Sequence, residues 1–367
     1  MPGKYHMIDY IHEAPEALTR TLEANEEPIL ALADSVSHLD LRRIVITGIG
    51  SSNTASLMAA PLWLQHSRLP VHFVESSEFG DLPSHMVDEH ALVIAVSRSG
   101  ERGLVVDACR RAAGAGAFTV SITGSADCLL AQKARVSLTT REGPEITFPK
   151  TKSVATCAGL LMRLALGLAG ADEPLAASRL AALRAAPQAM LRSLEATESE
   201  LKALLESMAP HEFVAIAGTG SNYGVALEAA MKLQEASFIP TYGNSTNGLL
   251  NGPVGALNNR WLLILLVTVH DQTLSNELLR VAVRFGADTL VVAESAVSLA
   301  ERPWHRMQIP GRIDSPLAAL SFLPPMQLIA YYWTVARGMN PDAPASMQAI
   351  LEAILPAGRQ EPELRTH

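Results

Sequence analysis

Short apolar runs, each followed by a loop rich in glycine or serine and then by a helical stretch, recur along the first third of the chain. The apolar runs predict buried strands at residues 44–47, 71–74, 91–96 and 119–123. Helices are predicted between them, over 54–64 and 104–113. Strands that alternate with helices indicate a parallel sheet with helices on both faces. Upstream, residues 9–40 predict one or two amphipathic helices.

The same pattern occurs a second time, offset by about 170 residues. Gly48, Gly50 and Ser51 of the first glycine loop recur as Gly218, Gly220 and Ser221. We therefore expect two copies of one flavodoxin-like, three-layer α/β/α domain. The predicted segments are an N-terminal helical segment, a first domain, a helical linker, a second domain and a C-terminal tail, over 1–38, 39–172, 173–207, 208–340 and 341–367.

The composition of the chain argues against several classes of function. With 48% hydrophobic residues, a net charge of −8 and no block of basic residues, the chain has a core and lacks the footprint of a nucleic-acid binder. Cys109, Cys128 and Cys157 form no Cys-x-x-Cys pair, so zinc and redox dithiol sites are not expected. No apolar run reaches the length of about 20 residues that spans a bilayer, and no signal peptide is visible. We expect a cytoplasmic protein with no membrane partner.

Two loops carry candidate chemistry. Ligands of parallel sheets bind at the carboxyl ends of the strands. The first loop, Ser97-Arg98-Ser99-Gly100, has two hydroxyls, a guanidinium and a glycine that leaves room for a phosphate monoester. The second loop has Ser51 and Ser52 and follows a neighbouring strand. The alternative is that these residues only form turns and helix caps. Neither loop has a nucleotide-binding fingerprint, so no nucleotide cofactor is expected.

The second copy contributes a different feature. Its counterpart of the serine loop reads Thr-Val-His-Asp over 268–271, and we expect no phosphate there. Its helix over 225–238 aligns Glu228, Lys232 and Glu235 on one face. These residues either form a solvated stripe of ion pairs or supply a general base close to C1 and C2 of a sugar.

Taken together, these residues resemble the sugar isomerase (SIS) domain family, in the tandem arrangement of the isomerase half of glucosamine-6-phosphate synthases. The similarity extends over about residues 40–350, and no residues remain for a glutamine-hydrolysing domain. The motifs that carry it are Gly50-Ser51-Ser52, Ser97-Arg98-Ser99-Gly100-Glu101, Glu145-Ile146, Thr151-Lys152, the helix from Ala226 to Glu235, and Gly252-Pro253.

The resemblance implies a sugar 6-phosphate as substrate and the absence of a metal or organic cofactor. The residues implied in binding it are Ser51, Ser52, Ser97, Arg98 and Ser99. Glu235 would move a proton between C1 and C2 through an enediol, supported by Lys232. A neighbouring protomer would complete the site, so a homodimer is expected.

Three departures from the family pattern bear on catalysis. Asn251 stands where the family places a ring-opening histidine, and an amide cannot exchange a proton near neutral pH. Ala349 falls where the family has a C-terminal lysine. Positive charge gathers at Arg98, Arg102, Lys150 and Lys152. It would suit a more anionic substrate or replace a lost threonine contact. His305 is a candidate substitute proton carrier.

The leading hypothesis is therefore an isomerase, or a deaminase or deglycase, of hexose or amino-sugar 6-phosphates. The alternative is a sugar-phosphate-binding protein without turnover. A transcription regulator is disfavoured, because the roughly 40 residues before the first strand are too few and too acidic for a helix-turn-helix domain.

Overall fold

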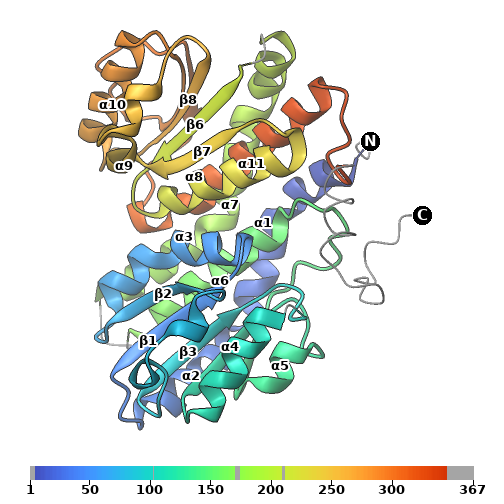
Figure 1. Ribbon diagram of the computed structural model, residues 1–367, viewed down its shortest axis with the longest axis vertical. Helices are drawn as coiled ribbons and strands as arrows, with labels where there is room; N and C mark the ends of the chain where they lie inside the picture. Colours follow the sequence, from blue (N-terminus) through green and yellow to red (C-terminus); the bar gives the residue numbers. More distant parts are fainter. Residues whose placement is uncertain (1–4, 102, 170–173, 209–210, 345–367) are drawn as a thin grey trace.

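A computed structural model of the chain describes residues 5–101, 103–169, 174–208 and 211–344. It holds two five-stranded parallel sheets that lie at opposite ends of the molecule, with a layer of helices between them (Figure 1). The predicted α/β fold with two copies of one domain is confirmed. Within the described ranges, no helix is long and apolar enough to cross a membrane.

The first sheet has the strand order β2-β1-β3-β4-β5. Its strands are β1 (Arg43–Gly48), β2 (Val71–Glu75), β3 (Ala91–Val96), β4 (Phe118–Thr123) and β5 (Val136–Thr139). The four strands predicted from apolar runs are confirmed. The fifth, β5, is a short edge strand of Val, Ser, Leu and Thr, and this composition gives no apolar run to detect.

The second sheet has the order β10-β9-β8-β6-β7 and repeats the topology of the first. Its strands are β6 (Phe213–Gly218), β7 (Thr241–Ser245), β8 (Trp261–Val267), β9 (Asp288–Glu294) and β10 (His305–Ile309). Strand β6 takes the place that β1 has in the first sheet, second from one edge with one neighbour on each side. The sequence repeat therefore corresponds to a structural repeat.

Helices fill the layer between the sheets and cover their outer faces (Figure 1). They are α1 (His6–Ala24), α2 (Glu26–Ser37), α3 (Ser51–His66), α4 (Gly103–Gly114), α5 (Leu129–Lys133), α6 (Lys152–Leu168), α7 (Pro174–Ser207), α8 (Ser221–Ser237), α9 (Thr246–Leu250), α10 (Gln272–Arg284) and α11 (Ala318–Ala336). The largest hydrophobic core is continuous between the two halves, with α3 and α6 of the first and α8 and α11 of the second contributing to it. The two domains thus share one core.

The contact between α3 and α8 positions the site. Gly224 on α8 lies so close to α3 that a Cβ atom there would be 2.5 Å from the Met58 nitrogen and 2.9 Å from the Thr54 carbonyl oxygen. Because glycine has no side chain, the first turn of α8 can pack directly against the backbone of α3 at Thr54 and Met58. The first turn of α3 follows the carboxyl end of β1, so residues of α8 reach the edge of the first sheet.

Candidate functional site

The serine loop follows β3 at the carboxyl edge of the first sheet. Strand register places Gly48 level with Val96, so the loops after β1 and β3 leave the sheet side by side. Ser97 is buried, and its hydroxyl accepts a hydrogen bond from the Gly100 N–H at 3.2 Å. Gly100 has a φ of +66°, and a Cβ atom there would lie 2.1 Å from Cys128 Sγ. Only glycine fits this turn, which holds the two serine hydroxyls at the sheet edge.

Ser51 and Ser52 begin α3, after a left-handed Gly50. The Ser51 hydroxyl donates to Glu228 Oε1 at 3.1 Å, so the predicted sugar contact is engaged with the second domain. Thr54, one turn later, donates to Glu228 Oε2 at 2.5 Å. Sequence reasoning missed Thr54, because a threonine inside a helix carries no signal of a partner 174 positions away.

The row of charges on α8 is enclosed by protein. Glu228 is 0% exposed and Lys232 is 1% exposed, so the solvated-stripe interpretation is wrong. Lys232 Nζ lies 3.5 Å from Glu228 Oε1 and donates a hydrogen bond to Glu235 Oε2. The Glu235 side chain keeps 20% of its surface exposed. Of the three, Glu235 is therefore the group that a ligand can reach.

Burial and charge pairing set the protonation of this row. Burial raises the pKa of the Glu228 carboxyl, and the Lys232 charge and the Thr54 hydroxyl oppose that rise. Burial alone would lower the pKa of Lys232, but the carboxylates of Glu235 and Glu228 hold it above its usual value. Lys232 is thus an ammonium group whose hydrogen bond orients the Glu235 carboxyl.

A buried pair of acids underlies the serine loop. Arg98 Nε lies 3.6 Å from Glu142 Oε1 and 4.0 Å from Glu145 Oε2. Glu145 Oε1 also accepts the backbone N–H groups of Thr151 at 2.7 Å and Lys152 at 2.9 Å, which caps the start of α6. The negative charge of Glu145 further contributes to the raised pKa of Lys232 on α8.

The extra cations are already engaged inside the chain. Lys150 Nζ donates to the carbonyl oxygens of Glu145 at 3.0 Å and Thr147 at 2.7 Å. Lys152 Nζ lies 2.5 Å from Glu13 Oε2. Arg102 lies outside the described residues. The surplus of positive charge expected to favour a more anionic substrate is therefore largely matched by acids and carbonyl groups of the protein.

Neither Asn251 nor the candidate proton carrier His305 has a hydrogen bond to the charged row of α8 in the described residues. Asn251 directly follows α9, where its amide donates to the Asn247 carbonyl at 2.8 Å. His305 begins β10 and lies 2.9 Å from Glu200 on α7, at the edge of the second sheet farthest from β7. Ala349 lies outside the described residues. Within the described chain, none of these contacts connects Asn251 or His305 with Glu235.

The described geometry thus offers serine hydroxyls in the neighbouring loops after β1 and β3. It also offers a carboxylate on α8 that a buried ammonium orients and that keeps part of its surface exposed. In the described part of the chain, no three His, Cys, Asp or Glu side chains are arranged to hold a metal ion.

Comparison with known proteins gives a consistent result. The profile of the SIS domain matches residues 39–167 and 208–337. A glutamine–fructose-6-phosphate aminotransferase [isomerizing] of Symbiobacterium thermophilum is 30% identical over 357 residues, which cover 94% of this chain and 58% of that protein. The chain therefore spans little more than half the length of this relative.

Solved structures share the whole fold. The C-terminal domain of glucosamine-fructose-6-phosphate aminotransferase from Francisella tularensis superposes with a TM-score of 0.83 at 20% identity, over 93% of this chain and 98% of that one. Tagatose-6-phosphate ketose/aldose isomerase from Escherichia coli gives a TM-score of 0.81 at 20% identity, over 93% and 95% of the two chains.

Proposed function

The chain belongs to the SIS domain family, and from this premise we propose that it interconverts the aldose and ketose forms of a sugar 6-phosphate. The observation that carries the proposal is Glu235, a partly exposed carboxylate held by the buried ammonium of Lys232. The relative named above is an isomerizing aminotransferase, and one solved neighbour is a ketose/aldose isomerase, which supports the same class of reaction.

In the proposed mechanism, the serine loop binds the phosphate and fixes the distance to the reacting carbons. Ser97 and Ser99 supply hydroxyl donors there. Glu235 takes the proton from C2 of the open-chain aldose and returns it to C1 through an enediol. The hydroxyl proton on O2 passes to the carbonyl oxygen O1. The hydrogen bond from Lys232 orients Glu235, as a positioned general base requires.

We further propose that a second protomer completes the site. Asn251 and the following glycine and proline lie at the exposed end of α9, and the Asn251 side chain is directed to Asn247 of its own helix. A group that opens the sugar ring would then come from a neighbouring chain. Sedimentation velocity tests this arrangement, and a monomer at micromolar concentration would contradict it.

Proton exchange tests the catalytic proposal directly. Hexose 6-phosphates and amino-sugar 6-phosphates are incubated with the protein in deuterated water, and loss of the C2 proton is followed by NMR. We expect exchange with the wild type and a reduction of about 100-fold or more in Glu235→Gln, the loss that removal of a general base typically causes. The control Glu27→Gln, an exposed position on α2, should exchange normally.

Binding is measured in parallel by thermal shift. Glu235→Gln should retain the shift that a sugar phosphate produces, whereas Ser97→Ala should lose it. Exchange that persists in Glu235→Gln would exclude this residue as the base. A ligand that binds at Ser97 without any exchange would instead support the alternative, a sugar-phosphate-binding protein without turnover.

A further inference from the structure

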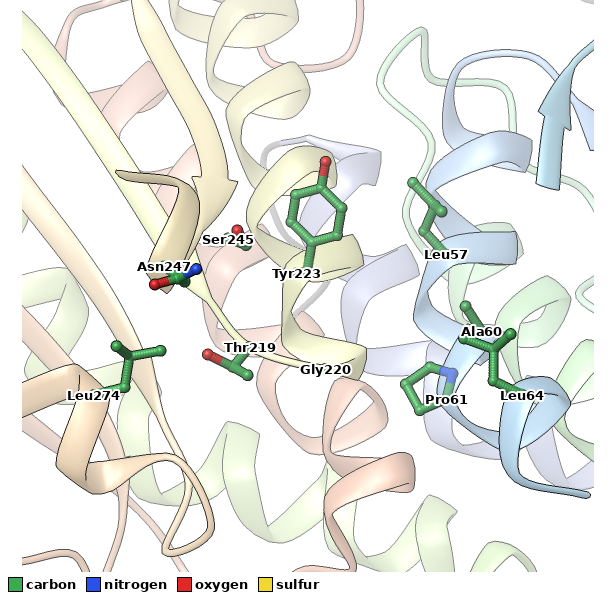
Figure 2. A pocket seen from close by; sticks show the side chains of 10 residues that line it. All are labelled: Leu57, Ala60, Pro61, Leu64, Thr219, Gly220, Tyr223, Ser245, Asn247 and Leu274. Carbon is green, nitrogen blue, oxygen red and sulfur yellow. The ribbon is translucent and has the colours of Figure 1, made fainter. Parts of the chain in front are cut away.

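A second pocket, with a volume of about 270 Å³, lies between α3 and the carboxyl edge of the second sheet (Figure 2). Residues that end β6 and β7 or begin α8, α9 and α10 form one side, and one face of α3 forms the other. The lining residues are Leu57, Ala60, Pro61, Leu64, Thr219, Gly220, Tyr223, Ser245, Asn247 and Leu274.

This pocket is the internal counterpart of the candidate site. Gly220 precedes α8 with a φ of +61°, as Gly50 precedes α3 with a φ of +57°. In the first domain, the loop at Gly50 faces α8, and a Cβ atom there would lie 3.9 Å from Met231 Sδ. In the second domain, the loop at Gly220 faces Pro61 of α3 across the pocket. Each sheet edge is thus closed by the helix of the other domain.

The two sheet edges differ in the side chains of the helix that faces them. At the first edge, α8 carries Glu228, Lys232 and Glu235. At the second, the face of α3 that lines the pocket consists of Leu57, Ala60, Pro61 and Leu64. This face carries no acid or base, so the pocket is not equipped for proton transfer.

In the second domain, an acidic residue stands where the first domain has the serine loop. Asp271, just before α10, accepts hydrogen bonds from the Thr268 N–H at 2.8 Å and the Thr268 hydroxyl at 2.5 Å, and its other oxygen lies 3.2 Å from Ser275 Oγ. Glu294, at the end of β9, is 0% exposed. Burial raises the pKa of the Glu294 carboxyl. Neither acid favours a phosphate at this edge of the sheet.

The remaining polar groups of the pocket are uncharged. Thr219 Oγ1 is buried and has no hydrogen-bond partner among the described residues. Figure 2 shows Thr219, Ser245 and Asn247 on one side of the pocket, across from the apolar face of α3. A buried hydroxyl without a partner is costly. Rotation of the Thr219 side chain about χ1 turns this hydroxyl toward the pocket, where a ligand atom that hydrogen-bonds to it removes that cost.

We propose that this pocket binds an uncharged, largely apolar small molecule with one hydroxyl or carbonyl group directed to Thr219. The volume suits this class, because a dry cavity of about 150 Å³ already accepts benzene. The apolar wall of α3 takes the ring, and the hydroxyl edge takes the polar substituent. The proposal concerns binding alone and does not depend on the reaction proposed for the first site.

Ligand-observed NMR titrations with benzyl alcohol, toluene and benzoate test the proposal on the full chain. Benzyl alcohol should bind at least tenfold more tightly than benzoate, because the anion meets no positive charge among the lining residues. Ala60→Phe fills the pocket and should weaken benzyl alcohol binding at least tenfold. The same substitution at Ala113, an exposed position on α4, should leave binding unchanged.

Thr219→Val replaces the hydroxyl with a methyl group of similar size, which keeps the test valid if Ala60→Phe fails to fold. It should abolish the preference for benzyl alcohol over toluene, a loss of about fivefold in affinity for one hydrogen bond. Ser97→Ala should leave all three affinities unchanged. Binding of benzoate as tight as that of benzyl alcohol, indifference to both pocket variants, or no binding by any probe would overturn the proposal.

Discussion

Lys232→Met tests whether the buried charges of α8 stabilise the protein as a unit. The variant removes the ammonium and leaves the fully buried Glu228 without its partner. At the observed separation of 3.5 Å, the attraction between two unit charges is about 5 kcal/mol at an effective dielectric constant of about 20. Removal of one partner of a buried pair typically costs about 3–5 kcal/mol. We therefore expect the free energy of unfolding to fall by about that amount.

The assay is urea unfolding at pH 7.5, followed by circular dichroism and tryptophan fluorescence. The double variant Glu228→Gln/Lys232→Met removes both charges, and it should recover at least half of the loss because no buried charge is left unpaired. Lys202→Met, at an exposed position on α7, serves as the control and should change the free energy by less than about 0.5 kcal/mol. A loss below about 1 kcal/mol in Lys232→Met, or a double variant less stable than the single one, would refute the reasoning.

Three further outcomes follow from the same structure. In Lys232→Met, the raised pKa of Glu228 favours the protonated folded state, so the deficit should be smaller at pH 5 than at pH 8 in the same urea assay; an equal deficit would contradict this. Gly224→Ala places a methyl group 2.5 Å from a backbone nitrogen of α3 and should cost about 1–3 kcal/mol, whereas Gly114→Ala, with open space around it, should cost nothing measurable by thermal unfolding. All three cysteines are buried, and burial raises the pKa of Cys109 to about 11, so a thiol reagent at pH 8 should react only as the protein unfolds; rapid labelling of the native protein would contradict their burial.

The sequence predicts the strands well because a strand buried on both faces must be apolar along its whole length. β1 and β3 meet this condition, and their predicted and observed limits differ by at most one residue. The edge strands β5 and β7 are partly polar, so their composition is that of a loop. Their place in the sheet depends on pairing with a neighbouring strand, which a local pattern does not contain.

The candidate site was predictable only in part. Helical spacing places Glu228, Lys232 and Glu235 on one face of α8, but it does not show that α3 covers that face. Packing between the two domains buries Glu228 and Lys232, and this burial is what distinguishes the observed row of charges from a solvated one. The role of Glu145 is hidden for a similar reason, since its hydrogen bonds to the start of α6 depend on how the loop before that helix folds.

The hydrogen bond between Thr54 and Glu228 joins residues 174 positions apart and bears on the order of events during synthesis. When the first sheet emerges from the ribosome, its serine loop can already form, but α8 has not yet been made. The charged row of α8 therefore reaches the carboxyl edge of the first sheet only after the second domain has begun to fold. Under the proposed function, a nascent first domain has the phosphate loop but still lacks the residue that transfers the proton.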